Sequence, residues 1–67
     1  MYEILKKALD MHGQATVHFQ SGAAIAINDI SGSFFDEDAI GANGSDGISH
    51  YIINLREIEY ISFENSD

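Results

Sequence analysis

Residues 2–12 carry apolar side chains at a helical spacing. The spacing i, i+1, i+4, i+5 and i+8 is typical of one face of an amphipathic helix. The members of this face are Ile4, Leu5, Ala8, Leu9 and His12. Gly13 follows, and glycine readily adopts the left-handed conformation that ends many helices. Because so short a helix is marginal in water alone, we expect it to lie on another element.

From residue 15 the hydrophobic period changes to two. Apolar and polar residues alternate over 15–20 and again over 23–28, on either side of the Ser21–Gly22 turn signal. Such a pattern predicts a β-hairpin with a short loop.

The rest of the chain predicts further short strands separated by turns. Residues 36–47 contain three of the six glycines and four of the eleven acidic residues, which predicts a mobile loop or hairpin tip. The other expected elements are a turn at 29–33, a third strand from Phe34 towards Ile40, a fourth from Ile48 to Leu55, a corner at Arg56–Glu57, a fifth strand from Ile58 to Phe63 and a polar tail over 64–67.

These elements predict one mainly β domain. Five short strands are too few for a good two-layer sandwich, but they can bend round into a small antiparallel barrel. We expect an N-terminal helix over 1–13 that covers one open end, a strongly bent five-stranded barrel over 14–64 and a tail over 65–67.

Length and composition add the question of what stabilises so small a domain. The chain has 67 residues, of which 45% are hydrophobic, and no cysteine. A chain of this size buries only about 60% of the surface that its unfolded form exposes. Disulfides are excluded, so oligomerisation is the leading expectation.

The charge balance bears on the partners. A formal net charge of −8 discourages non-specific binding to nucleic acid or to an anionic membrane. No stretch approaches the roughly 20 apolar residues of a membrane span. The N-terminus lacks the features of a secretory signal, so a cytoplasmic location without membrane association is expected.

No pattern indicates a catalytic, metal or cofactor site. The stretch Asp36–Gly41 begins like a calcium loop, but Ile40 and Gly47 occupy positions that need oxygen ligands. The three histidines are too widely spaced for a zinc motif, and no nucleophile-elbow signature is present. We therefore expect no enzyme activity, bound metal or cofactor.

Two stretches of the chain resemble the Sm, LSm and Hfq family of small ring-forming barrels. Residues 9–22, LDMHGQATVHFQSG, are similar to the family's helix end, first strand and glycine turn. Residues 53–61, INLREIEYI, are similar to its second signature, in which two apolar strand ends flank a short corner. Asn54–Leu55 stands where eukaryotic and archaeal members have Arg-Gly. The chain thus resembles a divergent member, such as those that phages encode.

The resemblance implies binding of single-stranded RNA, with a regulatory or chaperone role. By position the RNA pocket would combine Asp29 and Ser33 with Asn54 and Arg56, and Phe34 would stack on a base. Two alternatives stay open: Phe34 packs in the core or a subunit contact, and Asn54 holds the corner backbone. RNA binding also requires the acidic residues to lie away from this pocket, for which the 36–47 loop is a suitable place.

The last two predicted strands suggest how copies associate. Tyr51, Ile52, Tyr60 and Ile61 put apolar side chains on both faces of these strands, and an open barrel has edges that a free monomer must protect. Strand four of one copy can pair with strand five of the next, which the resemblance extends to a homo-oligomeric ring of about five to seven subunits. The alternatives are a slightly richer core for these four residues and, for the function, an acidic ring-forming structural or protein-interaction module that binds no RNA.

Overall fold

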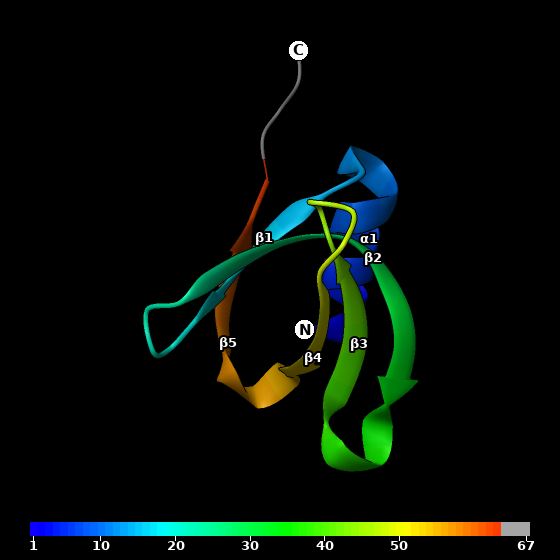
Figure 1. The fold of residues 1–67 in the computed structure, drawn as a ribbon. Helices are drawn as coiled ribbons and strands as arrows, with labels where there is room; N and C mark the ends of the chain where they lie inside the picture. Colours follow the sequence, from blue (N-terminus) through cyan, green and yellow to red (C-terminus); the bar gives the residue numbers. More distant parts are fainter. Residues whose placement is uncertain (64–67) are drawn as a thin grey trace.

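A computed structural model describes residues 1–63 of the chain as a helix followed by five strands (Figure 1). The predicted tail over 64–67 lies outside the described residues. The elements are α1 (Tyr2–His12), β1 (Ala15–Phe19), β2 (Ala24–Phe34), the 3₁₀ turn η1 (Phe35–Glu37), β3 (Ala39–Gly44), β4 (His50–Asn54), the 3₁₀ turn η2 (Leu55–Glu57) and β5 (Ile58–Ser62).

Helix α1 confirms the predicted span and end. Gly13 adopts a left-handed conformation with φ of 80°, and its N–H donates to the carbonyl of Leu9. Leu5, Ala8 and Leu9 are buried, so the helix lies on the sheet through this face. Ile4 was predicted on the same face, but it points away from the core and is 60% exposed.

The strands form one antiparallel sheet in the order β4-β3-β2-β1-β5. The predicted β1–β2 hairpin is confirmed, with Gly22 at a φ of 96° in its turn. Strand β2 is the longest, and its pairing with β3 shifts register at two places, Ile27/Asp29 and Ile30/Gly32. Such irregularities bend a strand, and β2 curves strongly around the molecule in Figure 1. The fold is therefore mainly β, with an N-terminal helix and a strongly bent five-stranded sheet.

Two predictions about the middle of the chain were wrong. Residues 29–33, predicted as a turn, lie inside β2, and residues 39–44, predicted as part of a mobile loop, form β3. Strand β3 is mostly buried, with Ile40 and Ala42 in the core. Small and polar residues here have turn propensity, but long-range pairing between β2 and β3 overrides that preference.

The core lies between the concave side of the sheet and α1. Its largest fully buried side chains are Leu5, Val17, Ile27, Ile40 and Ile53. They come from the helix and four different strands, so a single hydrophobic cluster joins nearly every element. Among the described residues, no helix has the length and apolar character that crossing a membrane requires.

Strand β4 ends one side of the sheet, and no other strand within residues 1–63 pairs with its outer edge. Hydrogen-bonded and non-bonded pairs alternate along an antiparallel ladder. Gly44 N donates to Ser49 O and Leu55 N donates to Asp38 O, both at 2.7 Å. This register directs the backbone groups of odd-numbered β4 residues to β3, so those of Ile52 point to the free edge.

Strand β5 ends the other side in the same way. Tyr60 lies opposite His18, and Ser62 opposite Thr16. Phe19 N donates to Ala23 O in the β1–β2 hairpin, so the backbone groups of odd-numbered β1 residues point to β2. Those of the even-numbered β1 residues therefore point to β5. The N–H and C=O of Ile61 therefore point away from the sheet.

Candidate functional site

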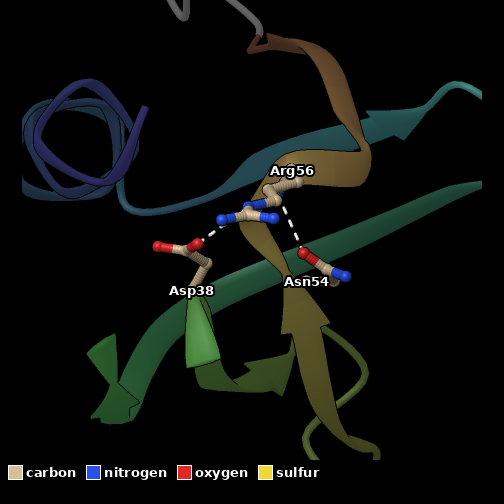
Figure 2. Close-up of polar contacts among 3 residues, drawn as sticks. All are labelled: Asp38, Asn54 and Arg56. Atoms are coloured by element: carbon tan, nitrogen blue, oxygen red, sulfur yellow. Dashed lines mark hydrogen bonds and ion pairs between the residues drawn. The ribbon is translucent and has the colours of Figure 1, made fainter. Parts of the chain in front are cut away.

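Polar contacts of Asp38, Asn54 and Arg56 lie where the β4–β5 corner meets the β2–β3 turn (Figure 2). The Arg56 Nε atom lies 2.8 Å from Asp38 Oδ2 in an ion pair that is largely exposed to solvent. The Leu55 N–H donates to the Asp38 carbonyl. Asp38 has a φ of 52°, a left-handed conformation that aspartate tolerates better than most residues. Side-chain and backbone contacts thus hold the two turns together.

Asn54 has a structural role at this corner. Its Oδ1 accepts a hydrogen bond of 3.0 Å from the Arg56 N–H and caps η2. This is the backbone-holding role that the sequence left open for Asn54. The two corner residues predicted to bind RNA are both engaged within the chain, Asn54 by the cap and Arg56 by Asp38.

Asp29 does not belong to the same site. It lies opposite Asn43 in the sheet, whose Nδ2 donates to Asp29 Oδ2 over 3.4 Å. Asn43 Oδ1 lies 2.7 Å from His50 Nδ1. Within one chain the structure does not bring Asp29 together with Asn54 and Arg56, because β2 continues to Phe34 and the turn beside the corner is 35–38.

Ser33 and Phe34 do lie close to this turn. They line a surface hollow of about 650 Å³ together with Asp36, Glu37, Ala39 and Ile52. Phe34 is 51% exposed and is not a core residue. Cross-strand register places Phe34 opposite Ala39 and Ala39 opposite Asn54, so Phe34 and Asn54 share one row of the sheet.

The acidic residues of this site were not predicted to belong to it. Asp36, Glu37 and Asp38 were expected in a loop away from the predicted pocket, whereas Asp38 pairs with Arg56 and the other two line the hollow. The run of three acids directly after two phenylalanines was the available signal. Its position depends on where β2 ends, which local patterns did not show.

The four residues predicted at a subunit interface divide into two pairs. Ile52 is 70% exposed and Tyr60 is also exposed, whereas Tyr51 and Ile61 are partly buried against the core. Tyr60 stacks on His18 with ring centroids 4.1 Å apart, and His18 Nε2 lies 2.8 Å from Ser62 Oγ. These contacts fix the outer face of β5 next to its free edge.

Within residues 1–63, no group of three or more histidine or acidic side chains is placed to hold a metal ion. The fold and site define a helix-covered, strongly bent five-stranded domain with two free sheet edges and an acidic, partly apolar hollow beside one of them. Comparison of the chain with protein-family models, curated proteins and solved structures finds no match.

Proposed function

We propose that this chain is a self-assembling protein-interaction module whose copies join through their free sheet edges. Strand β4 of one copy pairs with β5 of the next, and the rotation between copies closes a homo-oligomeric ring. The observation that carries the proposal is the strand order, which leaves one free edge at each side of the same sheet.

The chemistry of both edges supports this contact. Exposed backbone N–H and C=O groups make a strand edge a template for another strand. The exposed Ile52 side chain accompanies one edge and the exposed Tyr60 side chain the other. A contact between two different surfaces of identical chains propagates head to tail, and it closes into a ring when the rotation allows. The resemblance to the Sm, LSm and Hfq family favours the closed form.

Charge favours a protein partner over RNA at the corner. Phosphate binding depends on Lys and Arg, of which the chain has three. Arg56 is paired with Asp38, and Asp36 and Glu37 line the adjoining hollow. An incoming phosphate would meet more negative than positive groups.

RNA binding is the second candidate because of Phe34. Its exposed ring lies in the same row as Asn54, and stacking of a base on an aromatic ring contributes roughly 1–3 kcal/mol. This arrangement can hold a base without a strong phosphate contact.

Native mass spectrometry and light scattering test the assembly. We expect wild-type protein at micromolar concentration to have a mass several times the 7.4 kDa of one chain. Ile52→Pro removes an edge N–H that makes no bond to β3, and proline is tolerated on edge strands. Ile52→Ala is the matched control, since it shortens the same side chain but keeps the N–H. We expect I52P to be monomeric and folded by circular dichroism, and I52A to assemble; a monomeric wild type contradicts the proposal.

Fluorescence polarisation with labelled oligo-U and oligo-A separates the two candidates. At about 50 mM salt, where phosphate contacts are stronger than at physiological salt, we expect no binding at micromolar protein. Binding that Phe34→Ala abolishes would instead establish the RNA function.

A further inference from the structure

Strand β3 ends in the dipeptide Asn43–Gly44, which is the only asparagine–glycine pair in the sequence. Asparagine is a thermolabile residue, because its side-chain carbonyl can be attacked by the backbone nitrogen of the next residue. Glycine favours this attack, since it has no Cβ atom to hinder the approach and has the widest choice of backbone angles. The other three asparagines are followed by residues that carry a Cβ atom. Asn43 is therefore the asparagine of this chain that is most prone to lose its amide.

The reaction at Asn43 uses groups of the chain and water alone. The Gly44 nitrogen forms a bond to Asn43 Cγ, and the bond between Cγ and Nδ2 breaks. The amide nitrogen leaves as ammonia, together with the proton that the Gly44 nitrogen gives up. Water then opens the resulting succinimide ring, at one carbonyl to give aspartate and at the other to give isoaspartate. No oxidant, reductant or cofactor is required.

The folded chain engages both reacting groups. Gly44 is buried, and its N–H donates a hydrogen bond of 2.7 Å to Ser49 O across the β3–β4 turn. Asn43 Nδ2 donates to Asp29 Oδ2 over 3.4 Å, and Asn43 Oδ1 lies 2.7 Å from His50 Nδ1. Bond formation requires an aligned approach of the reacting atoms to about 3–3.5 Å. The Gly44 N–H must therefore leave Ser49 before it can react.

Packing requires a glycine at position 44. A Cβ atom added at Gly44 would lie 3.0 Å from Ser49 Cβ and 3.1 Å from both Asp46 Oδ1 and Tyr51 Cε2. These distances are shorter than the optimal separation of non-bonded atoms, so a larger residue would displace the turn. The residue that makes Asn43 reactive is thus the residue that the β3–β4 turn needs.

We propose that Asn43–Gly44 is a deamidation site gated by the β3–β4 turn. It is inert while the Gly44 N–H is bonded to Ser49 O, and it reacts when this end of the hairpin opens. Native proteins open locally at a lower free energy than they unfold globally. Residues 45–48 of the turn are exposed, so little burial opposes their opening. This inference depends on neither self-assembly nor RNA binding.

Either product prevents the hairpin from re-forming as before. Asn43 lies opposite Asp29, and an aspartate formed from it would replace the amide donor by a second carboxylate. Like charges directly opposite each other destabilise a sheet. Isoaspartate lengthens the backbone by one carbon before Gly44, which disturbs the register that fixes which side chains face the core. The modification is thus a one-way record of opening at this end of β3.

Peptide mass spectrometry tests the site, because it follows each asparagine separately. Wild-type chain is incubated in mildly alkaline buffer with and without guanidinium chloride. In the denaturant we expect Asn43 to react faster than Asn28, which is the internal control, and Asn43→Gln to show no reaction at this position. In buffer we expect Asn43 to react at least about tenfold more slowly than in denaturant, because the rate follows the fraction of open molecules. Equal rates in buffer and denaturant, or an Asn43 no faster than Asn28 in denaturant, would overturn the proposal.

Two variants separate local opening from global unfolding. Asp46→Ala removes the carboxylate that holds Ser49 in the turn, whereas Asn54→Ala removes a cap at the opposite end of β4. Circular dichroism checks that both are folded, and urea denaturation gives the unfolded fraction at which they are compared. We expect Asn43 to react at least about threefold faster in D46A than in N54A, because the hydrogen bonds of the turn are lost. Equal rates at equal unfolded fraction would show that global unfolding, and not the turn, controls the site, and would overturn the gating.

Discussion

Asp46 organises the turn between β3 and β4 with one carboxylate. Its Oδ1 accepts hydrogen bonds from the N–H groups of Ile48 and Ser49 at 2.9 and 2.8 Å, and its Oδ2 accepts from Ser49 Oγ at 2.6 Å. The Ser49 hydroxyl, followed by the two N–H groups, lowers the pKa of the carboxyl from its usual 3.8 to about 2. The ionised form is thus favoured in the folded chain.

This pKa predicts a pH-dependent contribution to stability. A group whose pKa is lower in the folded state stabilises the fold above its unfolded pKa, and the contribution fades as the pH falls towards the folded pKa. We expect the free energy of unfolding of wild type to exceed that of Asp46→Asn above pH 4, and the difference to shrink between about pH 4 and pH 2. Urea denaturation across this range measures it; a constant difference contradicts the role of the charge.

Asn54 and Arg56 are expected to differ in their effects on stability. Replacing a capping asparagine by alanine costs about 1 kcal/mol, whereas an exposed ion pair contributes less than about 1 kcal/mol and often much less. We expect Asn54→Ala to lower the urea midpoint more than Arg56→Ala does. Asn54→Ser, which keeps an acceptor oxygen, is the control and should stay close to wild type. A larger effect of R56A would show that the ion pair, and not the cap, holds the corner.

At the scale of elements, β3 is the strand that the local sequence pattern did not predict. We expect Ile40→Ala to destabilise the fold by about 2–5 kcal/mol, because Ile40 is fully buried and its truncation leaves a cavity. Ile48→Ala is the matched control in the turn that follows β3, since Ile48 is 80% exposed. Urea denaturation of both variants measures the contrast. Equal effects would place Ile40 on the surface, as a mobile loop requires.

The elements also show how far the sequence predicted the fold. The helix, its glycine end and the β1–β2 hairpin follow from local periodicity, and the structure has them at nearly the predicted bounds. The turn predicted at 29–33 failed because Gly32 and Gly41 face each other across β2 and β3. Two small residues paired in this way are compatible with a strand, although each alone favours a turn.

At the scale of the whole molecule, stability should depend on protein concentration. Anything that binds only the folded state raises the melting temperature as its concentration increases, and copies of this chain are the proposed partner. We expect the Tm of wild type to rise between about 2 and 200 µM protein and that of I52P to change much less. Differential scanning fluorimetry measures both. An invariant wild-type Tm would argue against stabilising self-association.

For the candidate site, as for the fold, the local parts were predictable from the sequence and the long-range parts were not. Asn54 and Arg56 were predicted at one corner and do lie there. This could be predicted because they are close in the chain and flank a recognisable strand end. It also grouped Asp29 with them, which depended on an early end of β2. Since β2 continues to Phe34, Asp29 lies beside Asn43 and the acidic turn takes its place at the corner.

The sequence by itself determined a small, acidic, cysteine-free chain and predicted one helix and five strands. It also predicted marginal stability for the single copy, because so short a chain buries a small core. Those properties depend on composition and on periodicities within a few residues. Only the tertiary structure decided which residues share a surface. Pairing of β3 with β4 places Asp38 against Arg56, and pairing of β2 with β3 places Gly32 opposite Gly41. Contacts between distant segments are set by strand register and not by local pattern.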